Sequence, residues 1–348
     1  MKVYETDHVL AFLDQAPSAP GYPCHLEGEP CARRWTRTRK HNSRTILLQR
    51  GLGMRLLFGS LALALAAPLS AQVYAPAVVA DPPVDAQVPA EMAAFQLPSH
   101  GAMLNAVFYL AAGKGPHPTM LLLHGFPGNE QNLDLAQAAR RSGWNVLTLH
   151  YRGSWGSGGA FTFAHCAEDA DAAVAFLRSP EAAAKYRIDP SRIVVGGHSM
   201  GGMMAARATA DDKQVAGLIL IDAWDIAADG RKLKGAPPAA VAALKTQDLA
   251  NDLPPLSGTS LDQMVAELAE ASPSLDLALT TKAALPRPIL ILGAERANGA
   301  GMRDLASATQ KAGGKDVSLI VMPTDHSFSD HRLALEDAVV RWLARFQH

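Results

Sequence analysis

Residues 192–208 are RIVVGGHSMGGMMAARA, in which a β-type apolar run passes through a cluster of glycines into an alanine-rich helical pattern. At its centre, residues 197–201 (GHSMG) match G-x-S-x-G, the pattern of a sharp strand-to-helix turn that exposes a nucleophilic serine. The backbone of such a serine is strained, and flanking glycines remove the Cβ clashes that would block the turn. The stretch therefore predicts Ser199 at the end of a strand, with the N–H of Met200 facing a developing oxyanion.

Strand-like and helix-like patterns alternate on both sides of this turn. A hairpin is expected over residues 92–113, and strands separated by helices predict parallel pairing with right-handed crossovers. The sequence thus favours a mixed, mostly parallel α/β sheet, whose chemistry collects at the carboxyl ends of its strands. The other strands are expected at 119–125, 145–151, 192–197, 216–224, 287–293 and 317–323, and helices near 133–141, 168–177, 202–210 and 333–346.

One connection is unusually long, because about sixty residues separate Trp224 from Pro286. Within it, Ser260 and Gln263 form a capping-box pattern, followed by apolar residues on one helical face. We expect a small helical lid over the pocket at about 225–285. The alternative is an elaborated surface crossover.

Three motifs, in chain order, resemble those of the α/β-hydrolase superfamily: HGFPG at 124–128, HYRGSWGSGG at 150–159 and GGHSMGG at 196–202. The resemblance covers roughly residues 93–343. It is nearest to the serine hydrolases that include bacterial esterases, dienelactone-hydrolase-like enzymes and peptidases of the dipeptidyl type. It implies a mostly parallel central sheet with helices on both faces, an oxyanion hole formed by the N–H groups of Phe126 and Met200, and no cofactor.

The base must be a histidine that can reach the Ser199 hydroxyl. The sequence MPTDHSFSDHR at 322–332 offers His326 and His331 after the last strand, in the order serine, acid, histidine that the fold uses. The family resemblance places the base where His326 stands, so His326 is favoured. Asp325 is its neighbour in sequence, but adjacent loop side chains tend to point apart.

The acid should be a carboxylate at the end of the penultimate strand, where it would hold the histidine Nδ1–H and stabilise the imidazolium. That strand ends ILILGAERANGAG, with Glu295 where many relatives carry aspartate, and we expect Glu295 to be the acid. Asp222, which ends the preceding strand in GLILID, is the alternative. Asp225 and Asp304 are less favoured.

The composition excludes some classes of partner. The formal charge of −1 gives no electrostatic reason to bind nucleic acid or an anionic membrane. Cys24 and Cys31 lack a second pair of ligands for zinc, and Cys166 alone cannot form an intramolecular disulfide, so no metal site is expected. A small, near-neutral substrate fits better.

The N-terminal region differs from the rest of the chain. Residues 54–71, MRLLFGSLALALAAPLSA, have the layout of a secretory signal peptide, so we expect a periplasmic or secreted protein without stable membrane insertion after cleavage. Residues 1–53 would then be a mis-annotated or remnant upstream segment; residues 1–21 resemble the opening of the histidine-triad nucleotide hydrolases, without that family's His-x-His-x-His. Residues 72–90 are expected to be an extended linker before a catalytic domain at 91–348.

The leading hypothesis is a serine hydrolase that cleaves a carboxylic ester of a small substrate through an acyl-enzyme. A serine peptidase of the aminopeptidase or dipeptidyl-peptidase type is the alternative. A non-catalytic binding protein of the same fold is the third possibility; oligomeric state is not predicted. The peptidase would use acidic residues of the lid to bind a substrate amino group, with Asp248, Asp252, Glu267, Glu270 and Asp276 as candidates.

Overall fold

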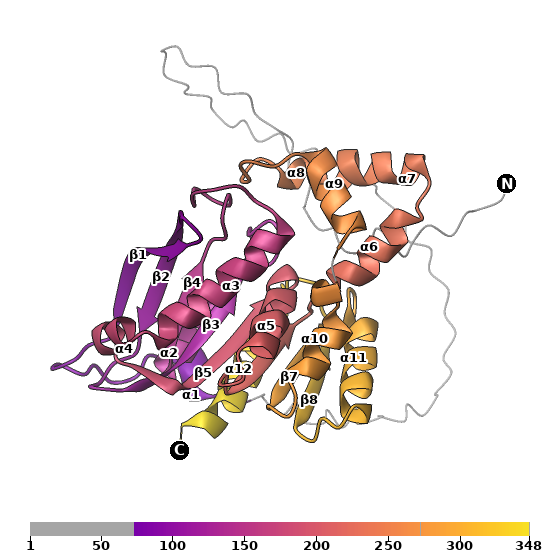
Figure 1. The fold of residues 1–348 in the computed structure, drawn as a ribbon. Coiled ribbons are helices and arrows are strands. Elements are labelled where there is room, and N and C mark those ends of the chain that lie inside the picture. Colours follow the sequence, from indigo (N-terminus) through magenta and orange to yellow (C-terminus); the bar gives the residue numbers. More distant parts are fainter. Residues whose placement is uncertain (1–72, 272, 348) are drawn as a thin grey trace, which may run out of the picture. The chain divides into compact units, whose positions relative to one another are not determined.

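In the computed structural model, residues 73–271 and 273–347 are described, and eight strands within them form one sheet (Figure 1). Its order is β1-β2-β4-β3-β5-β6-β7-β8. The β1–β2 hairpin and the β2–β4 pair are antiparallel, and all other neighbours are parallel, which confirms the predicted mixed sheet. The strands are β1 (Glu91–Ser99), β2 (Ala102–Leu110), β3 (His117–Leu123), β4 (Asn145–Leu149), β5 (Ile188–His198), β6 (Gly217–Ile221), β7 (Ile289–Ala294) and β8 (Val317–Met322).

Helices cover both faces of the sheet because its central strands are apolar on both sides. On β3, Leu121 and Leu123 pack into the layer that contains α3, α5, α10 and α11, whereas Met120 and Leu122 pack against α2 and α12. Successive side chains of a strand point to opposite faces, so one continuous apolar run supplies both cores. These helices are α2 (Leu133–Arg141), α3 (Phe163–Arg178), α5 (Met200–Asp211), α10 (Leu277–Ala283), α11 (Gly299–Lys311) and α12 (Arg332–Leu343), with the short α4 (Pro180–Tyr186) after α3.

The long connection between β6 and β7 is helical, and we call residues 226–283 the helical insertion. Its last helix, α10, packs against α5 and α11, while α6 and α9 pack on each other. Figure 1 shows α6 to α9 together beyond one end of the sheet, and α6 begins just after the carboxyl end of β6. The remaining elements are α6 (Ile226–Lys234), α7 (Pro238–Ala243), the π-helix η1 (Leu244–Leu249), α8 (Ala250–Asp252), α9 (Leu261–Ala269) and the 3₁₀ turn η2 (Pro273–Leu275).

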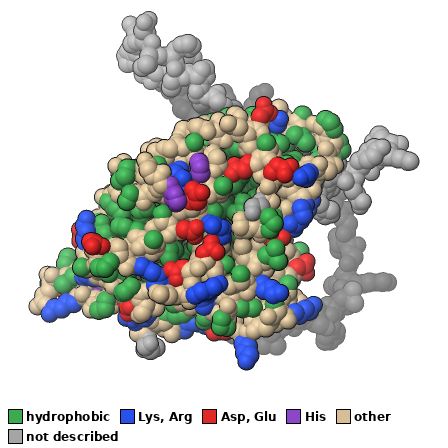
Figure 2. Space-filling view, in the orientation of Figure 1, with side chains coloured by type: hydrophobic (Ala, Val, Ile, Leu, Met, Phe, Trp, Pro, Cys, Tyr) green, Lys and Arg blue, Asp and Glu red, His purple; other side chains and the backbone are tan. Residues whose placement is uncertain are grey.

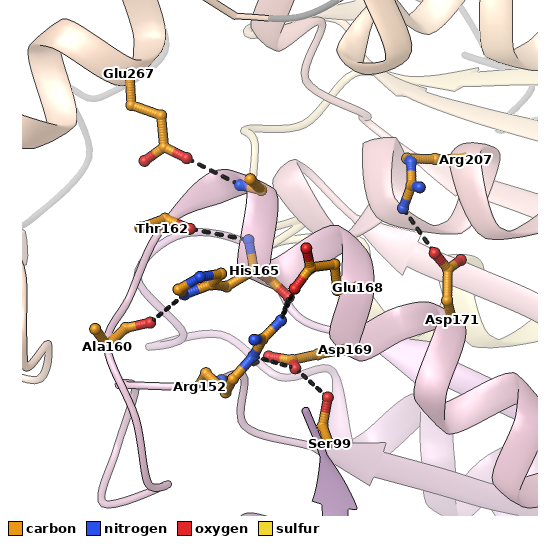
Figure 3. A network of polar contacts seen from close by, with 11 residues as sticks. Ser99, Arg152, Ala160, Thr162, His165, Glu168, Asp169, Asp171, Arg207 and Glu267 are labelled. Carbon is orange, nitrogen blue, oxygen red and sulfur yellow. Dashed lines mark hydrogen bonds and ion pairs between the residues drawn. The ribbon is translucent and has the colours of Figure 1, made fainter. Parts of the chain in front are cut away.

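Hydrogen bonds attach the helical insertion to the loop that follows β4. The Trp155 N–H donates to the Pro255 carbonyl (2.9 Å), and the Ser257 N–H donates to the Gly153 carbonyl (2.8 Å). In addition, Glu267 of α9 accepts the Ala164 N–H at the start of α3, 2.9 Å away (Figure 3). The insertion is therefore fixed at two separate points on the sheet domain.

The described part of the expected linker is not wholly extended. It contains a short helix, α1 (Pro76–Val79), whose Val78 is buried against Ala138 of α2 and Val340 of α12. The Asp337 carboxylate accepts the Ala75 N–H (2.6 Å). The α1 segment therefore packs on two helices, and its composition of proline and small apolar residues did not indicate this contact.

The predictions for residues 1–53 and for the signal-like segment 54–71 lie outside the described residues. Within residues 73–271 and 273–347, none of the helices has both the length and the apolar character needed to cross a membrane.

Candidate active site

Ser199 lies in a strained turn between β5 and α5. Its φ of 54° and ψ of −121° fall in a region that side-chain-bearing residues rarely adopt. The turn is held from β6, because the Ser199 N–H donates to the Ile221 carbonyl (2.9 Å) and the Trp224 N–H donates to the Ser199 carbonyl (3.0 Å). Ser199 thus has the geometry that its sequence motif predicts.

The glycines beside Ser199 are required by close backbone approaches. A Cβ on Gly197 would lie 2.2 Å from the Gly201 carbonyl oxygen, and a Cβ on Gly201 would lie 2.2 Å from the carbonyl oxygen of Leu123. No larger residue fits either position without moving the backbone. The first turn of α5 can therefore pack directly on the ends of β3 and β5.

The two residues expected to supply oxyanion N–H groups, Met200 and Phe126, belong to segments that adjoin Ser199. Met200 is the first residue of α5, so its N–H has no acceptor within the helix, and the helix dipole favours negative charge there. Phe126 follows Gly125, whose ideal Cβ position is only 3.0 Å from the Ser199 Cβ. The Phe126 ring packs near Phe161, with centroids 5.6 Å apart. The loop after β3 therefore lies against the nucleophile turn, as the proposed oxyanion hole requires.

Two side chains, those of His124 and Trp155, brace this loop. His124 donates its Nδ1–H to the Gly125 carbonyl (2.6 Å), and burial lowers its pKa to about 4, so the ring is neutral at pH 7. The indole N–H of Trp155 donates to the Pro127 carbonyl (2.9 Å). The neutral His124 ring thus holds the backbone of this loop through Nδ1.

His326 pairs with Asp222. The His326 Nδ1 lies 2.6 Å from Asp222 Oδ2, and Asp222 is fully buried at the carboxyl end of β6. The Asp222 carboxylate also accepts the Ala294 N–H (2.9 Å) and the Asn298 N–H (3.3 Å). These donors stabilise a buried carboxylate, which in turn orients the imidazole. His326 lies beside the nucleophile turn, because its carbonyl contacts the ring of His198 (2.8 Å).

The carboxylate at His326 Nδ1 is therefore not Glu295, as we expected, but the alternative, Asp222. Glu295 is half exposed and its carboxylate pairs with Arg303 of α11. Asp222 has a positive φ of 42°, and its carboxylate reaches over the end of β7 to the Ala294 N–H. The carboxylate that contacts His326 thus directly follows β6, and it is anchored by β7, the strand after which the acid was expected.

The other candidates near the base face elsewhere. His331 contacts Asp330 (3.1 Å) just before α12. Asp325 accepts the Ser329 N–H (2.8 Å) within its own turn. Neither position supports a role at Ser199.

Arg152 belongs to a structural network (Figure 3). Its Nε donates to the buried carboxylate of Asp169 (2.6 Å), which also accepts the Ser99 hydroxyl (2.6 Å), and its guanidinium pairs with Glu168 (2.5 Å). The network joins the loop after β4 to α3 and to the turn of the β1–β2 hairpin. Arg152 holds the scaffold and contributes nothing to the proposed chemistry.

The described residues contain no group of three or more His, Cys, Asp or Glu side chains that could hold a metal ion. Acidic and basic side chains are interspersed on the face drawn in Figure 2, so that face has no large patch of one sign.

Comparisons with known proteins identify the family and agree with the fold. The sequence profile described as "Alpha/beta hydrolase family" matches residues 120–338, whereas the search of curated proteins gave no match. Among solved structures, the metagenomic carboxylesterase EstE1 is 19% identical, with 78% of this chain and 92% of that chain covered and a TM-score of 0.52. An esterase of Pyrobaculum calidifontis is 18% identical (75% and 86% covered, TM-score 0.54), and Est1E of Butyrivibrio proteoclasticus, solved with ferulic acid, is 18% identical (72% and 98%, TM-score 0.56). At such identities the likeness concerns the fold.

Proposed function

Since this chain belongs to the alpha/beta hydrolase family, we propose that it is a serine hydrolase that cleaves a carboxylic ester of a small substrate. One observation carries the proposal: a histidine whose Nδ1 is held by the buried carboxylate of Asp222 contacts His198, the residue before the strained Ser199. This is the arrangement of nucleophile, base and orienting acid that acyl transfer requires. The esterases among the structural neighbours support the choice of an ester over other acyl compounds.

In the proposed mechanism, the Ser199 Oγ attacks the ester carbonyl while Nε2 of His326 accepts the hydroxyl proton. Asp222 stabilises the imidazolium, and the N–H groups of Phe126 and Met200 stabilise the oxyanion of the tetrahedral intermediate. His326 then protonates the leaving alcohol, and a water molecule activated by the same ring releases the acid from the acyl-enzyme.

The helical insertion is proposed to cover the site as a lid. It starts at Ile226, directly after the segment that contains Asp222 and Trp224. Its apolar residues include Val241, Leu253 and Leu261, which pack against the larger core cluster. Such a cover supports an apolar acyl or alcohol group in the substrate. The signal-like segment at 54–71 supports a periplasmic or secreted location.

The peptidase alternative receives less support from the helical insertion. Three of the five acidic residues that could bind an amino group have partners inside the protein. Glu267 accepts the Ala164 N–H, Glu270 pairs with Lys234, and Asp276 pairs with Arg231. These three carboxylates are therefore already engaged by other groups of the protein.

Labelling with a fluorophosphonate tests the proposal directly. The wild-type protein should be labelled, and the Ser199→Ala variant should not. A panel of p-nitrophenyl esters and aminoacyl-p-nitroanilides then separates esterase from peptidase activity, with Ser199→Ala as the control. A folded wild-type protein that is neither labelled nor active would rule out the hydrolase and leave the binding protein.

A further inference from the structure

His198, which precedes the nucleophile, is buried between the nucleophile turn and the base. It is 4% exposed, and its ring lies 4.5 Å from that of His326, centroid to centroid. Its Nε2 lies 2.8 Å from the backbone carbonyl oxygen of His326. Because a carbonyl oxygen can only accept, Nε2 carries the proton and donates it.

This contact fixes one tautomer of a neutral ring. The pKa of His198 is well below its ordinary value, mainly because the ring is buried and secondly because His326 is nearby. The ring is therefore uncharged at pH 7, with its proton on Nε2 and its lone pair on Nδ1. Within the described residues Nδ1 has no hydrogen-bond partner. The ring therefore has no second hydrogen-bonded group among these residues to which it could relay a proton.

We infer that His198 is a positioning residue, whose Nε2–H holds the backbone of His326 and so keeps the base at the correct distance from Ser199. The inference rests on the proposed function. His326 is held from two sides: Asp222 fixes its ring through Nδ1, and His198 fixes its carbonyl. The Asp222 contact sets the direction of the ring, and other hydrogen bonds hold the loop after β8 to Arg296 and Arg332. The His198 contact joins that loop to the residue next to the nucleophile, so base and nucleophile keep one spacing.

The consequence for activity follows from how strongly acyl transfer depends on distance. A displacement of about 1 Å in a catalytic group can lower the rate roughly 100-fold. Loss of the His198 contact should therefore reduce kcat by roughly 10- to 100-fold and change KM little, because the residue does not touch the substrate.

A matched pair of variants tests the inference. In His198→Gln, no atom replaces Nδ1, but the terminal NH₂ group lies nearly where Nε2 was and can still donate a hydrogen bond. In His198→Met, a side chain of the same length has no donor. We expect His198→Gln to keep kcat within about 5-fold of the wild type and His198→Met to lose roughly 10- to 100-fold, with equal KM and similar melting temperatures. A merely structural role would affect both variants alike.

A second measurement does not depend on turnover. The proton between His326 Nδ1 and Asp222 should give a downfield ¹H NMR signal in the wild type and in His198→Gln, and a shifted or exchange-broadened signal in His198→Met. If the wild type is not labelled by a fluorophosphonate, the proposed function fails, but the NMR comparison still reports on the contact. Full activity and an unchanged signal in His198→Met, or equal losses in both folded variants, would overturn the inference.

Discussion

Replacing Asp222 by asparagine tests whether Asp222, rather than Glu295, is the acid that orients His326. In the wild type, Oδ1 accepts the Ala294 N–H (2.9 Å), while Oδ2 faces the Asn298 N–H (3.3 Å) and His326 Nδ1 (2.6 Å). The asparagine oxygen should stay on Ala294, because the Ala294 N–H is closer (2.9 Å) than the Asn298 N–H (3.3 Å), which the NH₂ group then faces. The NH₂ group then donates to Nδ1 of His326 and forces the ring proton onto Nε2, where it blocks proton transfer from Ser199.

The expected loss is large because the tautomer is wrong in every molecule. The same change in the triad of a serine protease lowers kcat about 10⁴-fold, which corresponds to about 5 kcal/mol in the activation free energy. We expect Asp222→Asn to lose 10³- to 10⁴-fold in kcat for a p-nitrophenyl ester while remaining folded. The control is Glu295→Gln, which should stay within about 2-fold, because Glu295 is half exposed and pairs with Arg303. A folded Asp222→Asn enzyme that retains more than a tenth of kcat, or an equal loss in Glu295→Gln, would refute the assignment.

Two further predictions concern stability. Burial lowers the pKa of His124 from 6.5 to about 4, so the unfolded chain binds the proton more readily than the folded one; the folded state should lose up to about 3 kcal/mol from this group as the pH falls from 7 to 4. Chemical denaturation at several pH values should show that the free energy of unfolding falls less steeply as the pH is lowered in His124→Gln than in the wild type. An identical pH dependence in the two proteins would contradict the assignment to His124. The Gly201→Ala variant should fail to accumulate as soluble protein, because its Cβ would lie 2.2 Å from the Leu123 carbonyl oxygen, whereas Gly235→Ala, with 3.9 Å to its nearest neighbour, should express normally. Soluble, fully active Gly201→Ala would show that the turn can relax.

The sequence best predicts those features of the fold whose signal lies in neighbouring residues. The nucleophile turn can be predicted from residues 197–201 alone, and the strand before it and the helix after it are predicted by the apolar patterns on either side. The mixed sheet is predictable for the same reason, because the hairpin turn and the apolar strands each carry their own signal. These parts of the fold need no knowledge of distant contacts.

The acid depends on contacts that a linear pattern does not contain. Asp222 and Glu295 both follow apolar strands, and the sequence favours Glu295 over the alternative Asp222. The choice is made by the positive φ of Asp222 and by N–H donors from Ala294 and Asn298, more than seventy residues away. The helix that begins at Gly299 was not predicted, because its glycine-rich start gives a weak helical signal. Asn298, one of the two donors, precedes this helix.

The short segment after β6 connects two members of the site. The side chain of Asp222 holds His326, and two residues later the backbone N–H of Trp224 holds the carbonyl of Ser199. Any small motion of this strand end therefore carries acid and nucleophile in the same direction. The helical insertion starts only at Ile226, after this joint attachment. On heating, activity should thus persist until the sheet itself unfolds, so that inactivation and melting coincide.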